Sequence, residues 1–414
     1  MCFTLKKLVN DTLLCYNILY YFFIVMKMNQ RVLINKILTN NPINSFQSST
    51  DRYKRNYGID LLRIFAMINI INLHINGRIG LKDLKKNNIK FKNIWRLQTF
   101  SFFAVNCFGL ISGIVGFNKY KFSNLIYLWL VSVFYCVNNH LCLFFQNRIN
   151  LRELLLSFFP ILIKFQWYVN AYFIMYLFLP FINLGIKLLT IKTFRNLVYF
   201  YIFFFSIYYI CSALFRKTDY NFLIGGFSSS WLTILYIIGS YFGKYILENL
   251  NKSKIIKFYY FINYIGFSFL SSEIFFITGK RFLVSYLSPT ILFQAISLVM
   301  LFYSINITNT LTIKIIKFIT PSIFSVILIQ QTLFSLNIKI VLSLFELIKE
   351  SNNTFLFFKI YIVSVIIFIF CIIIDFFRLL LFKILKIREI CQYIEKIFPH
   401  IFDKFLLKTK YLFN

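Results

Sequence analysis

Two side chains within one apolar stretch have types and a spacing that suit proton transfer and anion binding. Arg63 and His74 lie between Arg55 and Gly77, 11 positions apart. At about 100° per residue they return to nearly the same face of a helix, about 16 Å apart along its axis. Histidine is readily poised to move a proton near neutral pH, whereas arginine stays charged and suits a phosphate or an oxyanion. Because ionisable groups are costly in lipid, this pair is a candidate functional site.

The same stretch also has a structural interpretation, which the residues alone leave open. Asp60 is the i, i+3 neighbour of Arg63, so the two could pair at the membrane surface while the arginine stem lies along the helix. His74 could bond to a backbone carbonyl of a facing helix. The expected helix therefore carries either a reactive pair or two satisfied polar side chains.

A second apolar stretch, FFAVNCFGLISGIVGF, combines polar and small side chains. Small residues at Gly109, Gly113 and Gly116 let helices approach closely, so we expect packing rather than chemistry there. Asn106 and Ser112 are expected to hydrogen-bond the first helix and are candidate substrate-binding residues. Ser112 lacks the sequence context of a catalytic serine, and no Ser-His-acid triad can be assigned.

Three further positions carry candidate groups with two interpretations each. Trp167, Tyr168 and Tyr172 form an aromatic patch on which a sugar ring could stack, although aromatic residues at a membrane interface commonly serve as anchors. His140 is expected to have an interfacial or core role rather than a catalytic one. Glu273 is expected either to line a substrate cavity or to be a satisfied buried carboxyl group.

The elements that must position these side chains are membrane-spanning helices. The chain has 414 residues, of which 59% are hydrophobic and only 14% charged. Apolar windows of about 20 residues, the length needed to cross a bilayer, recur along it. We therefore expect an all-α polytopic bundle of about ten spans in one membrane domain, residues 51–385. The expected spans are 59–76, 97–117, 125–145, 167–188, 197–214, 229–246, 258–278, 282–303, 318–344 and 357–381.

The two ends of the chain are expected to lie outside this bundle. Residues 1–50 are interpreted as an N-terminal extension that is interfacial or precedes the true start, at Met26 or Met28. Residues 386–414 mix basic and apolar residues at helical spacing, which indicates a basic amphipathic tail on the membrane surface. The distribution of Lys and Arg favours cytoplasmic termini in a cell membrane, although the basic first loop points the other way.

The composition also excludes some classes of function. The net charge of +31 reflects basic loops that anchor and orient the chain, and no soluble basic face exists for nucleic acid. The eight cysteines are scattered without a Cys-x-x-Cys pair, which indicates neither a disulfide framework nor a metal site.

Several stretches, in this order, resemble the membrane acyltransferase family 3, whose multi-span members acylate surface polysaccharides and similar acceptors. RNYGIDLLRIFAMINIINLH looks like the family opening, in which an arginine and a histidine are separated by ten residues. AVNCFGLISGIVGF is similar to the second-span motif, and GGFSSSWLTILYIIGSYFGKY to the sixth span. The resemblance extends over about residues 55–382. A tryptophan-tyrosine, proline and asparagine signature is matched by Trp167, Tyr168, Pro180 and Asn183.

By position, this resemblance implies roles for individual residues. His74 becomes the expected catalytic base, and Arg63 the residue that engages the acyl-CoA side. The family's ninth span commonly reads Tyr-Leu-Ile-His, whereas this chain has Ile-Leu-Ile-Gln ending at Gln330. An amide cannot supply an imidazole, so the departure puts any role of that second histidine in doubt and affects the choice of acceptor.

Together these observations predict an integral membrane O-acyltransferase that moves an acyl group, expected to be acetyl, from acyl-CoA to a hydroxyl. The expected acceptor is a cell-envelope polysaccharide or a lipid-linked sugar. No bound cofactor or metal is expected; acetyl-CoA is the donor substrate, and a partner acyl-handling protein would receive the acyl group if the reaction is not completed here. The alternatives are a transporter or flippase of lipid-linked oligosaccharide, a membrane glycosyltransferase, and a non-catalytic scaffold.

Overall fold

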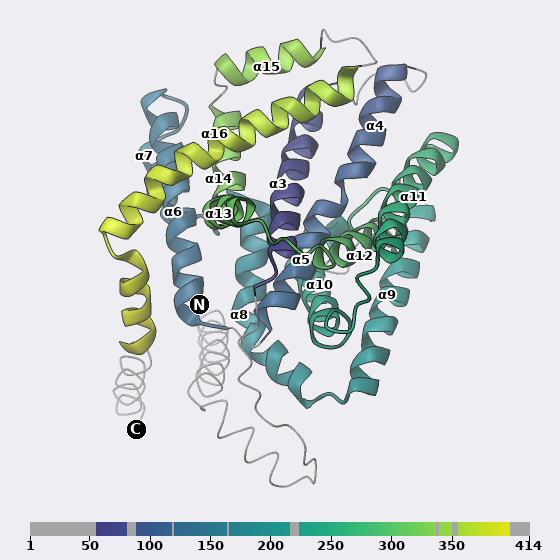
Figure 1. The fold of residues 1–414 in the computed structure, drawn as a ribbon. Helices are drawn as coiled ribbons and strands as arrows, with labels where there is room; N and C mark the ends of the chain where they lie inside the picture. The colour runs from purple at the N-terminus through teal and green to yellow at the C-terminus, as the bar shows by residue number, and fades with distance from the viewer. Residues whose placement is uncertain are drawn as a thin grey trace, which may run out of the picture.

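A computed structural model describes residues 55–80, 88–117, 120–163, 165–215, 223–336, 339–349 and 355–397. Helices and connecting turns make up this part of the chain, and it contains no strand. The predicted N-terminal extension, residues 1–50, and residues 398–414 of the predicted tail lie outside the described residues. Residues 387–397 of that tail are helical. The expected all-α polytopic bundle is therefore confirmed (Figure 1).

The first half of the described chain runs from α3 to α9. Its helices are α3 (Tyr57–Arg78), α4 (Ile89–Ser101), α5 (Phe103–Gly116), α6 (Phe122–Phe145), α7 (Leu151–Leu156), α8 (Trp167–Leu188) and α9 (Ile191–Leu214). The second half comprises η2 (Ile224–Gly226), α10 (Ser229–Tyr241), η3 (Phe242–Ile246), α11 (Lys254–Thr278), α12 (Pro289–Tyr303), α13 (Thr310–Ile319), η4 (Thr320–Ser322), α14 (Ile323–Ser335), α15 (Lys339–Lys349) and α16 (Leu356–Ile384).

Eight helical stretches in the described part are long and apolar enough to cross a membrane. They correspond to all the expected spans except the sixth and the eighth. The sixth is the short α10 followed by a π-helical turn, Phe242–Ile246. The eighth is α12, which is shortened because turns occupy residues 280–288 and Pro289 sits in its first turn.

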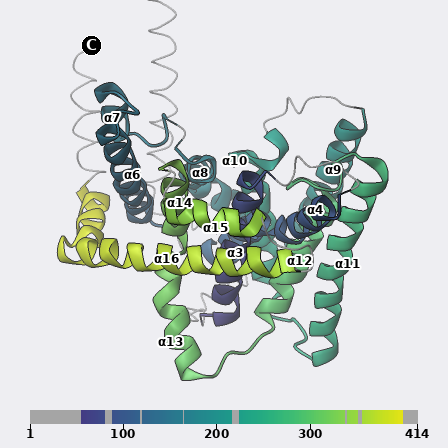
Figure 2. The same cartoon turned by 90° about the horizontal axis from the view of Figure 1, so that it is seen from above.

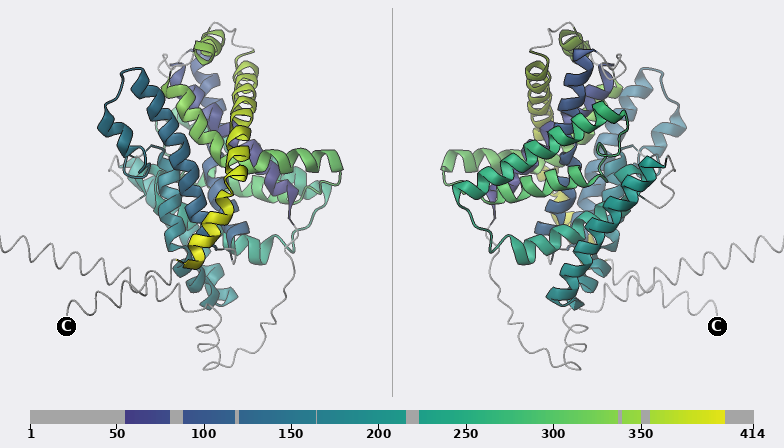
Figure 3. Two further views of the ribbon diagram at one scale, coloured as in Figure 1. Left: turned by 90° about the vertical axis from the view of Figure 1, so that its left-hand side faces the viewer. Right: turned by 90° about the vertical axis from the view of Figure 1, so that its right-hand side faces the viewer.

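The ninth expected span is bent rather than straight. α13 ends at Ile319, the turn η4 contains Pro321, and α14 begins at Ile323. A proline lacks the N–H that would continue the helix, so the chain changes direction here. Figure 1 looks along α13 while α3 and α6 run up the page, and Figure 3 shows α13 lying across them. α14 is thereby placed in the bundle centre, packed against α3, α6 and α16.

Glycines let α5 and α10 approach each other closely. A Cβ added at Gly113 would lie 2.0 Å from the Tyr236 carbonyl oxygen, and one at Gly239 would lie 2.1 Å from that of Leu110. No side chain fits at such distances, so both positions require glycine. The small residues of the second stretch therefore serve packing, as predicted.

α16 runs across the bundle and carries an ion pair that sequence reasoning missed (Figure 2). Asp375 and Arg378 are buried, with Nε of the arginine 2.7 Å from Oδ1 of the carboxylate. Tyr135 of α6 donates to Asp375 at 2.6 Å, and Arg378 donates to Tyr127 of α6 at 3.1 Å. Because every member has a partner, this network fixes α16 to α6 without an uncompensated buried charge.

Candidate functional site

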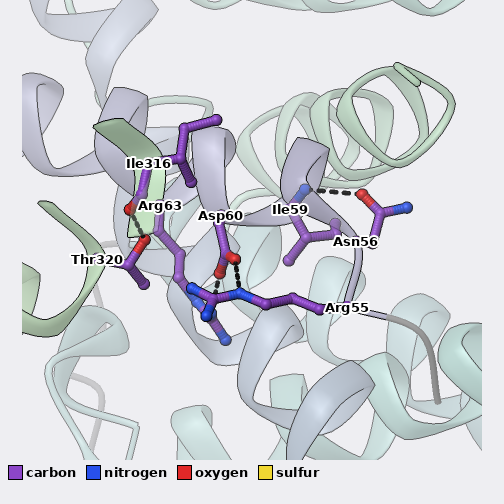
Figure 4. A network of polar contacts seen from close by, with 7 residues as sticks. All are labelled: Arg55, Asn56, Ile59, Asp60, Arg63, Ile316 and Thr320. Atoms are coloured by element: carbon purple, nitrogen blue, oxygen red, sulfur yellow. Dashed lines mark hydrogen bonds and ion pairs between the residues drawn. The ribbon is translucent and has the colours of Figure 1, made fainter. Parts of the chain in front are cut away.

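The start of α3 and the residues just before it hold a cluster of charged side chains (Figure 4). Asn56 begins the helix, and its side chain accepts a hydrogen bond from the Ile59 N–H at 3.1 Å. Asp60 is buried and pairs with Arg63 at 2.6 Å and with Arg55 at 2.5 Å. One carboxylate thus faces two guanidinium groups. The pairing of Asp60 with Arg63 anticipated from their spacing is present, and the cluster keeps a net positive charge.

Arg63 also lies near two hydroxyl groups of α8. It interacts electrostatically with the hydroxyls of Tyr168 and Tyr172 on α8. Ser112 of α5 lies beside the Tyr172 hydroxyl and donates to the Phe108 carbonyl at 2.7 Å, and the rings of Tyr168 and Tyr172 stack with centroids 6.0 Å apart. Helix α8 therefore adjoins Arg63, and Ser112 of α5 adjoins Tyr172 of that helix. A guanidinium group has five N–H donors, so this arrangement suits a ligand rich in anionic oxygen.

The aromatic patch predicted at the start of α8 is one cluster with two connecting segments. Trp167 lies against Tyr168, Phe227 and Tyr286, with ring centroids 5.6, 4.7 and 6.3 Å away. Trp167 remains partly exposed, whereas Tyr168 and Tyr286 are buried. Phe227 is exposed, so Trp167 and Phe227 are the members of this cluster that a ligand could reach.

His74 lies on the same face of α3 as Arg63, three turns further along, and is partly buried. One turn after it, Arg78 donates to the Phe334 carbonyl of α14 at 3.4 Å and covers the Phe334 ring at 4.8 Å. The contact of Arg78 shows which face of α3 lies toward α14. Residues one turn apart on a helix point in nearly the same direction, so His74 is also directed toward α14.

The opposite face of α3 carries a buried asparagine stripe, Asn69, Asn72 and Asn76. Asn69 accepts from Ser101 of α4 at 2.9 Å and donates to Tyr361 of α16 at 3.1 Å. Asn72 accepts from Ser364 of α16. These contacts hold α3 between α4 and α16, which leaves the face of Arg63 and His74 for other groups.

Gln330 of α14 is fully buried, and neither its amide nitrogen nor its amide oxygen has a hydrogen-bond partner among the described residues. Gln330 lies one turn before Phe334, and His74 lies one turn before Arg78, the residue of α3 that contacts Phe334. The start of α14 lies beside α3 as well, because Lys317 at the end of α13 covers the Tyr57 ring at 5.6 Å and η4 packs on α3. The two helices therefore run in the same direction, so the turn of α14 that carries Gln330 lies beside the turn of α3 that carries His74.

Comparison with known proteins identifies the group to which this bundle belongs. A model of the acyltransferase 3 family, described as an acyltransferase domain, matches residues 56–374. The chain belongs to the acyltransferase 3 family. No curated protein and no solved structure matches it.

The acyltransferase match runs from the first turn of α3 into α16. It contains every predicted site residue and confirms the resemblance read from the sequence motifs. It ends one residue before Asp375, so the ion pair with Arg378 lies outside the matched region. Within the match, two groups of site residues stand apart along α3. The first comprises Asp60, Arg63, Ser112, Tyr168 and Tyr172, and the second His74 and Gln330.

Asn106 joins neither group in this acyltransferase. Its amide nitrogen donates to the Tyr286 carbonyl at 2.8 Å, and its amide oxygen accepts from Trp231 of α10 at 3.0 Å. Because both ends of the amide are occupied, the geometry gives Asn106 a structural contact between α5, α10 and the segment before α12. Its predicted contribution to substrate binding stays a prediction.

The two remaining candidates lie elsewhere in the acyltransferase. His140 on α6 contacts the Cys136 carbonyl one turn earlier, at 2.8 Å. Glu273 on α11 pairs with Arg96 of α4 at 2.8 Å in a partly exposed ion pair. Both side chains have partners. His140 fits its expected structural role, whereas Glu273 is paired with Arg96 but is not buried as its structural interpretation expected. No group of three His, Cys, Asp or Glu side chains in the described ranges could hold a metal ion.

Proposed function

We propose that this family member is an O-acyltransferase that moves an acyl group, acetyl in the simplest case, from acyl-CoA to a hydroxyl of a cell-envelope polysaccharide or lipid-linked sugar. The observation that carries the proposal is the position of Arg63 and His74 on one face of α3. A cationic cluster stands at one end of that face, and an imidazole stands about 16 Å further along the helix.

The proposed donor has a matching shape. Coenzyme A places its phosphates at one end of an extended arm and the reactive thioester at the other. Arg63, with the net positive charge of its cluster and the neighbouring Tyr168, Tyr172 and Ser112 hydroxyls, is suited to the phosphate end. The arm then reaches along α3 toward His74. Asp60 holds the Arg63 guanidinium in place.

In the proposed reaction, a ring nitrogen of His74 takes the proton of the acceptor hydroxyl as the oxygen attacks the thioester carbonyl carbon. The new carbon–oxygen bond forms, the carbon–sulfur bond breaks, and the coenzyme A thiolate leaves. The thiolate takes the proton back from the imidazolium, which restores neutral His74. Trp167, at the edge of the aromatic cluster, offers a ring on which a sugar of the acceptor can stack.

Replacing the imidazole tests this assignment. In membrane vesicles supplied with radiolabelled acetyl-CoA, His74→Ala should reduce label transfer to glycan by at least about 100-fold, the usual contribution of a general base. His140→Ala is the matched control, because that histidine lies on α6, where it contacts the Cys136 carbonyl at 2.8 Å and the Phe165 ring, and it should retain activity. Near-wild-type transfer by His74→Ala would remove His74 from the reaction.

The same assay separates the enzyme from a flippase. A transporter of lipid-linked oligosaccharide moves its substrate without forming an ester. If the wild-type protein transfers no label from acetyl-CoA to any glycan, the proposed activity fails and transport becomes the better account. We further propose a cell-membrane location with cytoplasmic termini, where acyl-CoA is available, and a partner acyl-handling protein where the acceptor lies beyond reach.

A further inference from the structure

The unpartnered amide of Gln330 identifies a second binding group beside His74. A buried polar side chain normally has a hydrogen-bond partner, because removing it from water without one is unfavourable. Gln330 is fully buried, and both polar atoms of its amide lack a partner among the described residues. It is the only side chain in that part of the chain for which both polar atoms are unpartnered.

The surroundings of Gln330 explain why no neighbour satisfies it. The positions directly before it on α14, Ile327, Leu328 and Ile329, are buried and apolar. The polar groups of the asparagine stripe lie on the far side of α3, turned toward α4 and α16. On the near side, the residue of α3 at the level of Gln330 is His74. Gln330 and His74 therefore lie on neighbouring turns of the packed helices α14 and α3, one turn before the contact of Phe334 with Arg78.

We propose that Gln330 binds the acceptor, and that it selects an uncharged group carrying both a hydrogen-bond donor and an acceptor. This inference rests on the proposed function and assigns the substrate class of the same site. An amide offers two N–H donors and one carbonyl acceptor. A carboxylate or phosphate would accept a hydrogen bond from the Gln330 amide nitrogen, but its second oxygen would face the amide carbonyl without a proton to donate. An ammonium group would satisfy only the carbonyl. A hydroxyl or an amide satisfies both.

The acceptor favoured by this chemistry is a neutral sugar or an N-acylated amino sugar. Uronic acids, free amino sugars and sugar phosphates also carry hydroxyls, but they would bring a charge close to the buried, apolar Ile327, Leu328 and Ile329, which is unfavourable. One hydroxyl or amide of the sugar bonds to Gln330, which orients the ring. A neighbouring hydroxyl is then directed at His74. Gln330 is thus a positioning and specificity residue, and it does not move a proton itself.

Methyl glycosides of four charge types test the inference by binding, independently of acyl transfer. The probes are the methyl β-glycosides of glucose, N-acetylglucosamine, glucuronic acid and glucosamine, added to the detergent-purified full chain. We expect the two neutral glycosides to raise the temperature of unfolding and the two charged ones to leave it unchanged. Gln330→Leu, of similar size but without hydrogen-bonding groups, should lose that rise.

Gln331→Leu is the matched control, since this neighbouring glutamine is on the same helix but only partly buried, and it should keep the wild-type response. Gln330→Glu supplies a second variant of the same shape, which accepts but no longer donates when ionised, and it should also lose selectivity for neutral glycosides. An equal response of Gln330→Leu and wild type, a stronger response to the charged glycosides, or no response of wild type to either neutral glycoside would overturn the inference.

The outcome can be separated from that of the proposed function. The acyl-transfer assay with His74→Ala reports on the chemistry, and the binding assay with Gln330→Leu reports on the acceptor. Where transfer occurs, Gln330→Leu should raise the KM for a neutral acceptor at least tenfold and leave the KM for acetyl-CoA unchanged. A fall in kcat alone, with both KM values unchanged, would contradict a role in acceptor binding.

Discussion

At the scale of residues, the geometry of Arg63 distinguishes it from the other cations near the start of α3. Its guanidinium pairs with the buried Asp60 and faces the hydroxyls of α8, whereas Arg55 pairs with the same carboxylate from a more exposed position, 48% against 25% for the Arg63 side chain. If Arg63 binds the phosphates of acyl-CoA through several N–H groups, a lysine cannot replace it. A lysine ammonium is a compact charge without the planar fork of donors.

Arg63→Lys should therefore lower kcat/KM for acetyl-CoA by about 10- to 100-fold, the loss of a hydrogen bond to a charged group, worth about 1.5–3 kcal/mol. The effect should appear mainly as a higher KM for the donor, measured by initial rates of label transfer in vesicles. Arg55→Lys is the control, because it keeps a charge at the exposed side of the same carboxylate. Equal KM values for the two variants would show that Arg63 acts only as a partner of Asp60.

At the scale of elements, the α5–α10 contact holds Ser112 in reach of Tyr172. Ser112 is followed directly by Gly113, whose Cα faces the Tyr236 carbonyl so closely that an added Cβ would lie 2.0 Å away. Gly113→Ala must push α5 away from α10, and overpacking of this kind costs about 1–3 kcal/mol. We expect a lower temperature of unfolding in detergent and a loss of acyl transfer, since Ser112 moves with the helix.

Gly185→Ala is the matched control for this element. Gly185 is exposed on α8, and nothing lies within 4 Å of an added Cβ. Because alanine favours the helix by about 1 kcal/mol over glycine, this variant should be as stable as the wild type or slightly more so. A Gly113→Ala variant with wild-type stability would mean that α5 and α10 can separate without cost.

Features of single residues and single helices could be predicted from the sequence. Helix geometry is regular, so the spacing of Arg63 and His74 was enough to place both on one face. The expectation that glycines of the second stretch serve packing also needed only local pattern. Contacts between distant segments could not be predicted. Asp375 and Arg378 lie within the most apolar span, and their partners Tyr127 and Tyr135 come from a helix about 240–250 positions earlier.

In the candidate site too, local patterns could be predicted from the sequence and contacts between distant segments could not. Gln330 was noticed as a departure from a family motif, but its lack of partners follows only from the bend at Pro321, which directs α14 along α3. The division of the sixth and eighth spans into shorter elements likewise depends on a π-helical turn and on the turns before Pro289, which hydropathy does not detect.

At the scale of the whole molecule, the described contacts relate the Arg63 cluster to the ends of the bundle. Tyr172, which faces Arg63, lies one turn before Tyr176 on α8, and Tyr176 donates to the Lys121 carbonyl at the start of α6. The helical tail docks at the same end, because Glu395 accepts from the N–H of Phe122 at 2.7 Å. These contacts connect the Arg63 cluster through α8 to the start of α6, where the tail docks, and Figure 1 shows the start of α6 below the start of α3.

The orientation of the chain in the membrane therefore tests whether the Arg63 cluster faces the side that holds acyl-CoA. If the tail is cytoplasmic, the Arg63 cluster faces the compartment that holds acyl-CoA. Lys192→Cys, at the start of α9 beside the end of α8, should react with a membrane-impermeant maleimide only after cells are opened. Arg152→Cys on α7 lies at the other end, where Arg148 donates to the Ser335 carbonyl at 2.9 Å, and it should react in intact cells. Both positions are exposed, and labelling is counted above that of the unmodified chain. The reverse pattern would place Arg63 on the outer side, away from acyl-CoA, and the proposed direction of transfer would be wrong.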